Sequence, residues 1–280
     1  MKIFKIMLPV IALLAVGTGC ANKHDVNNNE ESLDVINLIH YESCTNLNSE
    51  VACNNLGNSY SEGRGVKQDY SKANVYYEKA CNLNDNFGCY NLGNAYYFGR
   101  NVKSDYSKAN IYYEKACNLN YGSGCFNLGF SYEQGKGVKQ NYKKANTYYE
   151  KACNLNEGYG CFNIGWLYDD GKGVKQDYIK AKSYYEKSCN LDYDGGCLNL
   201  GFLYDKGLGL RQNMSVAVSY YEKGCKLKNN IACGNLGFLY ENGNGVRQNR
   251  TTAKEYYGKS CDLGNQKGCD AYRKLNEQGY

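Results

Sequence analysis

Proline is almost absent from this sequence, since Pro9 is the only one among 280 residues. A globular domain of mixed structure usually marks its loops with prolines, so this composition disfavours such a domain. Histidine is nearly as rare, with only His24 and His40. Zinc enzymes that gather histidines around the metal are therefore excluded, and we expect neither a metal site nor another cofactor.

A large excess of charge of one sign is also missing. The chain has 33 lysines and arginines against 28 aspartates and glutamates, a formal net charge of +5. The charges alternate in sign along the chain, so they give no electrostatic reason to expect a nucleic-acid partner. The apolar run Ile6–Val16 has about eleven residues, too few to span a bilayer, and no later stretch is more apolar.

Residues 1–20 have the pattern of an export signal. Lys2 and Lys5 form a short basic head, Ile6–Val16 the apolar run, and Gly17–Gly19 an exit of small residues. Export would place the protein in the periplasm, in the outer envelope or outside the cell. In such an oxidising compartment its cysteines can form disulfides.

Cys20 stands where a lipoprotein signal places its acylated residue. A lipid on Cys20 is therefore the only membrane link that we expect. The alternative is ordinary signal-peptidase cleavage, for example after Ala21. Residues 21–33 suit a flexible tether in either case.

What the sequence does contain is regular: 30 tyrosines, 32 glycines and 15 cysteines. The phrase YYEKACNLNDNFGC at Tyr76–Cys89 returns every 36 residues. Its further copies are Tyr112–Cys125, Tyr148–Cys161, Tyr184–Cys197, Tyr220–Cys233 and Tyr256–Cys269, and a degenerate copy lies at Cys44–Cys53. A fixed period of this size indicates a repeat array, in which each unit buries its apolar face against its neighbours.

Each repeat predicts two helices. Cys89, Leu92, Gly93 and Tyr96 recur at helical spacing, and Gly99 follows as a C-terminal stop. Asp105 is the expected N-cap of the second helix, which carries small and aromatic residues. The equivalent stops are Gly63, Gly135, Gly171, Gly207 and Gly243, and the equivalent caps are Asp69, Asn141, Asp177, Asn213 and Asn249.

A glycine in the first helix and an alanine in the second recur together, as Gly93 and Ala109 do. A glycine inside a helix costs about 1 kcal/mol relative to alanine, so its repetition needs a compensating reason. Close approach of the two helices is the simplest one. We therefore predict an all-α fold: an αα-hairpin solenoid over residues 34–280, with six full repeats, half-repeats at both ends and about fourteen helices. It should form a right-handed superhelix, with a concave groove lined by the first helices.

Fourteen of the fifteen cysteines form local pairs, and pairing across each short turn uses all of them. Pairing the start of one helix with the end of the next, as Cys53 with Cys81, would leave Cys44 and Cys269 unpaired. We therefore expect one disulfide per hairpin. The pairs are Cys44–Cys53, Cys81–Cys89, Cys117–Cys125, Cys153–Cys161, Cys189–Cys197, Cys225–Cys233 and Cys261–Cys269.

The candidate binding residues lie on the first helices. Two residues after each first-helix cysteine stands an asparagine, on the side opposite the apolar face. These are Asn55, Asn91, Asn127, Asn163, Asn199 and Asn235. Their amides can hydrogen-bond the backbone of an extended peptide, or alternatively form an internal ladder between repeats. Three residues further on stand Phe130, Trp166, Phe202 and Phe238, which are either anchors for a ligand or contacts between adjacent helices.

The motif LGxxYxxGxGVxQ(D/N)YxKAxxYYEKAC resembles the Sel-one-like repeat, a relative of the tetratricopeptide repeat. With the two cysteines of each turn, it is similar to the Helicobacter cysteine-rich protein family, and the likeness covers about residues 34–280. The resemblance implies a disulfide-bonded αα solenoid, secreted or periplasmic. Members are labelled as β-lactamases or penicillin-binding proteins, and others are discussed as factors that engage the host or cell-wall peptides.

The lactamase label has no support from motifs. The chain lacks S-x-x-K, S-D-N and K-T-G, which serine lactamases need to activate the nucleophile. The sequence therefore favours an exported monomer that binds a peptide or protein, such as a host factor or a cell-wall muropeptide, in its groove. Weak β-lactam hydrolysis and a structural envelope spacer are the alternatives, and no catalytic residue can be named.

Overall fold

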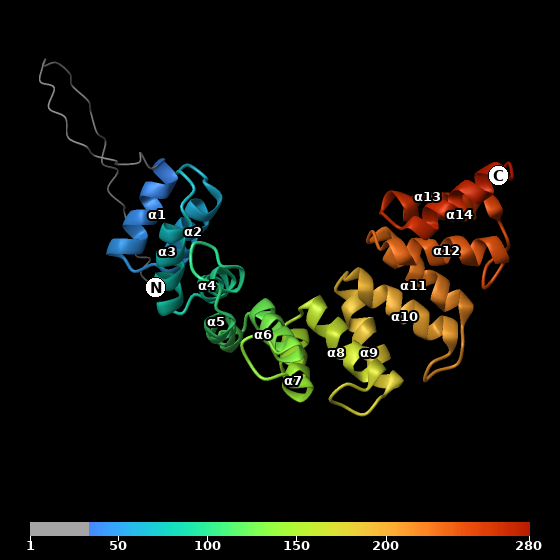
Figure 1. Ribbon diagram of the computed structural model, residues 1–280, viewed down its shortest axis with the longest axis horizontal. Coiled ribbons are helices and arrows are strands. Elements are labelled where there is room, and N and C mark those ends of the chain that lie inside the picture. The colour runs from blue at the N-terminus through green and yellow to red at the C-terminus, as the bar shows by residue number, and fades with distance from the viewer. Residues whose placement is uncertain (1–33) are drawn as a thin grey trace, which may run out of the picture. The chain divides into compact units, whose positions relative to one another are not determined.

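The computed structural model describes residues 34–280, and fourteen helices and no strand occur in this range (Figure 1). The even-numbered helices are the predicted first helices and the odd-numbered ones the second helices. The helices are α1 (Val35–Asn46), α2 (Glu50–Glu62), α3 (Tyr70–Asn82), α4 (Asn86–Phe98), α5 (Tyr106–Asn118), α6 (Gly122–Gln134), α7 (Tyr142–Asn154), α8 (Gly158–Asp170), α9 (Tyr178–Asn190), α10 (Asp194–Lys206), α11 (Met214–Lys226), α12 (Asn230–Asn242), α13 (Arg250–Asp262) and α14 (Gln266–Glu277).

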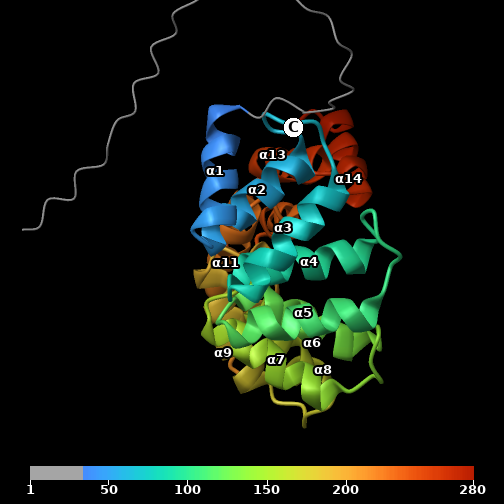
Figure 2. The same cartoon turned by 90° about the vertical axis from the view of Figure 1, so that its left-hand side faces the viewer.

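Consecutive helices pack against each other all along residues 34–280 (Figures 1 and 2). Even-numbered helices also contact each other, as α2 does with α4, α6 with α8, and α8 with α10. The even-numbered helices therefore form one side of the stack. The predicted solenoid of helical hairpins is confirmed, and the handedness of its superhelix stays a prediction.

The predicted helix ends are confirmed. Gly99 has φ 69°, in the left-handed region that favours glycine, and ends α4. The Asp105 side chain accepts a hydrogen bond from the backbone N–H of Lys108 and begins α5. The same two devices recur in each of the six full repeats, so the long loop within each repeat has the same ends throughout.

The recurring glycine of the first helix accommodates a tyrosine ring. A Cβ atom on Gly93 would lie 2.7 Å from the ring of Tyr113 and 3.3 Å from the carbonyl oxygen of Ala109. The helices do approach closely, as predicted, but the nearest obstacle is the tyrosine ring and not the alanine. Tyr113, Tyr149, Tyr185 and Tyr221 occupy this position and are at most 1% exposed.

A second set of tyrosines forms stacked pairs within each repeat. Tyr96 of α4 and Tyr112 of α5 lie with ring centroids 5.6 Å apart and planes 7° from parallel. The same pair recurs five times more, as Tyr60–Tyr76, Tyr132–Tyr148, Tyr168–Tyr184, Tyr204–Tyr220 and Tyr240–Tyr256. This explains the abundance of tyrosine: two aromatic residues per repeat fill the contact between the paired helices.

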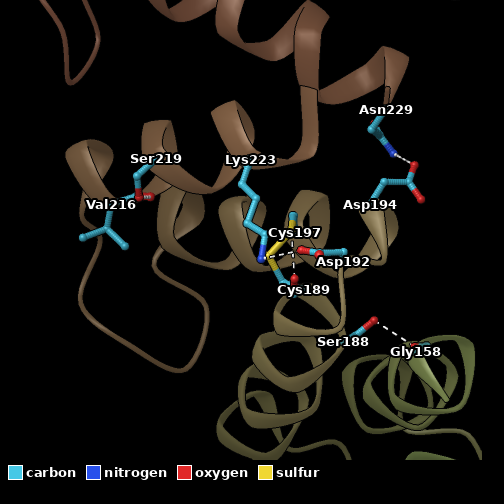
Figure 3. The surroundings of a disulfide bond; sticks show 10 residues. All are labelled: Gly158, Ser188, Cys189, Asp192, Asp194, Cys197, Val216, Ser219, Lys223 and Asn229. Atoms are coloured by element: carbon cyan, nitrogen blue, oxygen red, sulfur yellow. Dashed lines mark hydrogen bonds and ion pairs between the residues drawn. A yellow bond between two sulfur atoms is a disulfide. The ribbon is translucent and has the colours of Figure 1, made fainter. Parts of the chain in front are cut away.

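All seven predicted disulfides are present, one across each short turn. The paired Cα atoms lie 4.5–4.7 Å apart. Figure 3 shows the turn at Cys189–Cys197, where Lys223 of α11 forms a 3.0 Å ion pair with Asp192. Beside it, Asn229 donates a 2.8 Å hydrogen bond to Asp194. The turns therefore bond to the next hairpin as well as being closed by sulfur.

The export signal, the tether and the lipid site on Cys20 fall outside the described residues and stay predictions. Between residues 34 and 280, no helix is both long and apolar enough to cross a membrane. The seven disulfides indicate an oxidising environment for the protein.

Sequence analysis missed an asparagine ladder on the odd-numbered helices. The Asn110 amide nitrogen of α5 donates a 2.8 Å hydrogen bond to the carbonyl oxygen of Lys136, in the loop of the next repeat. Asn37 and Asn74 bond to Arg64 and Arg100 in the same way. The sequence signal was an asparagine after the recurring alanine at Asn74 and Asn110, whereas Asn37 follows Ile36. The partner of each lies in a separate loop, and only the fold shows it. These bonds hold the first three long loops in place.

Replacement of Asn110 by alanine is expected to lower the free energy of unfolding by about 1 kcal/mol, because it removes a hydrogen bond to a backbone carbonyl. Asn110 is 6% exposed, so little water replaces the lost bond. Urea unfolding followed by circular dichroism measures the change. Asn163→Ala is the matched control, since the Asn163 amide bonds only to the Tyr159 carbonyl of its own helix. Equal losses in both variants would show that the bond to the loop adds nothing.

Candidate binding face

The even-numbered helices form the candidate binding face, which we define by the six first-helix asparagines and the four aromatic residues predicted from the sequence. All six asparagines are half-buried. Phe202 and Phe238 are 43% and 53% exposed, whereas Phe130 and Trp166 are half-buried. The predicted residues therefore lie at the surface of one side, although they differ in their surroundings.

One hollow of this face lies between α10 and α12, and a larger one of about 790 Å³ lies on the other side of Asn235 and Phe238, towards α14. The hollow between α10 and α12 is a cavity of about 480 Å³ whose lining includes Asn199, Asn235, Phe202 and Phe238. We call it the α10–α12 cavity. Two predicted asparagines and two predicted aromatic residues thus meet in one place, where amide groups border an apolar surface.

A smaller cavity of about 280 Å³ lies between α4 and α6. Asn127 and Phe130 line it, together with Tyr97 and Phe98. Asn55, Asn91, Asn163 and Trp166 line neither of these two cavities. The ten predicted residues therefore do not line one continuous groove, and the cavities of this face gather only some of them.

Three of the asparagine amides also touch buried tyrosine hydroxyl groups. Burial raises the pKa of Tyr113, while the hydrogen bond with Asn127 of the following repeat lowers it. Asn199 and Asn235 bond to Tyr185 and Tyr221 in the same way. These contacts join adjacent repeats, so the internal ladder weighed in the sequence analysis has a physical basis at these three positions.

The other asparagines are less uniform. The Asn91 amide nitrogen lies 3.1 Å from the side-chain oxygen of Asn54 and 3.3 Å from that of Asn58. Asn163 bonds to a carbonyl of its own helix at 2.9 Å. A role in binding remains a prediction for all six; Asn127, Asn199 and Asn235 are the ones that line the α10–α12 cavity or the cavity between α4 and α6, and the same three also bond to buried tyrosines.

Sequence analysis missed a row of carboxylates beneath the aromatic residues. The Tyr149 hydroxyl donates a 2.6 Å hydrogen bond to Glu133, and Tyr185 and Tyr257 donate to Asp169 and Glu241 at 3.1 Å and 2.8 Å. Tyr221 and Asp205 repeat the arrangement at 3.5 Å. An acidic residue eight positions after the first-helix cysteine was the available signal.

The first two full repeats use a different acceptor for the buried tyrosine. Tyr77 and Tyr113 donate to the amide oxygens of Asn58 and Asn94 at 2.9 Å and 2.8 Å. Asn58 and Asn94 hold the positions that are aromatic in the four later repeats. A polar residue there thus removes the need for a carboxylate, and only the last four full repeats combine an aromatic surface with negative charge.

One aromatic row next to the face is internal packing. The ring of Phe126 lies 5.8 Å from that of Tyr149, and Phe162 lies 5.8 Å from Tyr185. These residues directly follow the first-helix cysteine and contact the buried tyrosine of the next helix. They pack between helices, and Phe126 also lines the cavity between α4 and α6.

Comparison with known proteins gives one family. The Sel1 repeat model matches residues 51–85, 87–121, 122–157, 158–193, 195–229 and 230–265. Each matched segment contains one even-numbered helix and the odd-numbered helix that follows. Five of the seven disulfides therefore join one matched repeat to the next, as Cys81 at the end of the first does with Cys89 in the second. No relative was found among curated proteins.

Solved structures with the same repeats are similar to this chain. A protective antigen of uropathogenic Escherichia coli is 28% identical with a TM-score of 0.78, over 86% of this chain and 51% of that one. This chain thus spans about half the length of that antigen. A Sel1 repeat protein from Oxalobacter formigenes is 27% identical with a TM-score of 0.73, over 80% and 92% of the two chains. Helicobacter pylori cysteine rich protein B is 34% identical, over 48% of this chain and 96% of that one, with a TM-score of 0.40.

Proposed function

This chain belongs to the Sel1 repeat family, and from that premise we propose that it is an exported protein which binds a peptide or protein partner on the face of its even-numbered helices. Stacked helical repeats present extended surfaces that other proteins recognise. The proposal places the partner outside the cytoplasm, as a host factor or a cell-wall peptide.

The observation that carries the proposal is the content of the α10–α12 cavity. Phe202 and Phe238 expose about half of each ring beside the amides of Asn199 and Asn235. Aromatic side chains supply apolar contact area, and an amide offers both donors and an acceptor for a peptide backbone. A largely apolar hollow with a few polar groups is the usual form of a binding site.

The neighbouring repeats extend the same surface. Phe130 and Asn127 border the smaller cavity on the same side of the stack. A bound peptide that follows the even-numbered helices from α6 to α12 would meet one aromatic residue and one amide per repeat. Several weak contacts at a fixed spacing would then add up to useful affinity without a deep pocket.

The test is a titration of the oxidised protein with a panel of cell-wall muropeptides and random peptides. The fluorescence of Trp166, the only tryptophan, reports binding, and the chromogenic lactam nitrocefin in parallel wells reports turnover. We expect saturable binding without turnover. Phe202→Ala and Phe238→Ala should each weaken binding roughly tenfold, as an aromatic anchor does, and Asn199→Ala by a smaller factor.

Ile179→Ala is the matched control. Ile179 is 68% exposed and lies on the odd-numbered helix α9, away from the proposed surface, so its loss should leave affinity unchanged. Binding that survives both phenylalanine substitutions would show that another face is used. A protein that binds nothing in the panel would favour a structural spacer, and lactam turnover would favour a hydrolase.

A further inference from the structure

Lysines of the chain itself lie over the aromatic residues of the binding face. The Lys172 ammonium is 4.3 Å from the ring centroid of Trp166, and Lys136 is 5.6 Å from that of Phe130. Lys206 is 5.8 Å from the ring of Phe202. An ammonium within about 6 Å of a ring is attracted by the negative charge of its face. The rings of Phe130, Trp166 and Phe202 are therefore cation sites that lysines of the chain already occupy.

Phe238 is the fourth ring of the row, and its surroundings differ. Within the described part of the chain, no lysine or arginine lies over it. Asn242 stands at the repeat position of Lys206, and Asn244 at the position of Lys136 and Lys172. Phe238 is also the more exposed of the two rings in the α10–α12 cavity, at 53%. Phe238, the most exposed ring of the row, is therefore the one that no cation of the described chain covers.

The same cavity has a surplus of negative charge. Its lining contains two carboxylates, Asp169 and Asp205, against one cation, Lys206. Lys206 lies 3.1 Å from Asp205. Asp169 accepts a hydrogen bond from the Tyr185 hydroxyl, and burial raises its pKa because it disfavours the charged carboxylate. A second cation would therefore be favoured here.

We propose that the α10–α12 cavity binds a lysine or arginine side chain of the peptide partner. The cation would lie on the Phe238 ring and face the carboxylates of Asp205 and Asp169, and the amides of Asn199 and Asn235 would hold the adjoining backbone. This inference rests on the proposed function, because it takes the peptide-binding face as given and names the side chain that the face selects. It follows from charge complementarity and from the arrangement that the chain itself repeats three times.

Selection from an immobilised library of short random peptides tests the inference. Peptides retained by the oxidised protein should be enriched in lysine or arginine at one position. Replacement of that residue by norleucine, which keeps the carbon chain and removes the charge, should weaken binding roughly tenfold. A glutamate there should abolish binding.

Two variants assign the effect to this cavity. Asp205→Asn keeps an oxygen for the Tyr221 hydroxyl and should weaken the basic peptide while leaving its norleucine form unchanged. Lys206→Met removes the cation that competes for Asp205 and should strengthen the basic peptide several-fold, an effect in the opposite direction.

The outcomes separate this inference from the proposed function. Retained peptides without a basic residue, whose binding still depends on Phe202, would overturn the inference and leave the binding face established. The same holds if Lys206→Met weakens the basic peptide. A library in which no peptide is retained would overturn both.

Discussion

Reduction of the seven disulfides is expected to unfold the protein at room temperature. Each disulfide closes a loop of about nine residues, and in the chain-entropy model a loop of this size is worth roughly 2.6 kcal/mol. Seven such bridges amount to about 18 kcal/mol, more than the 5–15 kcal/mol that typically separates a folded domain from its unfolded state. The loss is not made up by long-range packing, because each repeat packs only against its neighbours.

The measurement is the far-ultraviolet circular dichroism of the protein with and without a phosphine reductant, at neutral pH and without denaturant. Most of the helical signal should be lost on reduction and return on reoxidation. The double variant Cys153→Ser with Cys161→Ser is the graded control, and it should lose about 2.6 kcal/mol and stay folded. Retention of the full helical signal and of the melting temperature after complete reduction would show that tyrosine packing alone holds the stack.

The second large effect is expected at alkaline pH. Burial raises the pKa of Tyr113, Tyr149, Tyr185 and Tyr221 above the usual value near 10. The unfolded chain therefore loses these protons first as the pH rises, whereas the folded chain keeps them. Their stabilisation is present in full below pH 10 and is lost as the pH rises from there towards the raised values.

The four tyrosines should act together. Each buried hydroxyl changes the free energy of unfolding by about 1.4 kcal/mol per pH unit in this range, so the four lower it by about 5 kcal/mol per pH unit above pH 10. Tyrosines of the stacked pairs add to the effect. Tyr148 is one of them, and burial and the charge of Glu114 raise its pKa to about 12. Unfolding should therefore be steep and cooperative in alkali.

Absorbance of tyrosinate and circular dichroism, recorded together during brief exposure to rising pH, measure this transition. Ionisation of the buried tyrosines and loss of helix should coincide and reverse at neutral pH. In Tyr221→Phe the slope should be shallower by about 1.4 kcal/mol per pH unit. Smooth titration of all tyrosines near pH 10 with the helices intact would contradict the burial described here.

Much of the fold was predictable because its signals are local. The stop at Gly99 and the cap at Asp105 each depend on the conformation of a few adjacent residues. The disulfide pairing followed from the two ends of the cysteine series, and the structure confirms it. A period of 36 residues then propagates one correct repeat along the whole chain.

The binding face was less predictable because its contacts join residues far apart in the sequence. The helical spacing placed Phe238 and Asn235 on one side of a helix, but not in a cavity with Phe202 and Asn199 of the preceding repeat. The carboxylate of Asp205 forms an ion pair with Lys206 and accepts a hydrogen bond from the hydroxyl of Tyr221, a residue of the following helix. Such contacts depend on how adjacent helices pack, which no single repeat encodes.

The position of the disulfides has a consequence for how this protein can change over evolutionary time. Because each bridge joins one repeat to the next over a short separation, every cysteine finds its partner within eight residues from Cys81 onwards. Unequal recombination that inserts or deletes one 36-residue unit in this region, wherever the crossover falls, leaves no lone thiol. A chain of this design can therefore gain or lose binding units without passing through a misbridged intermediate.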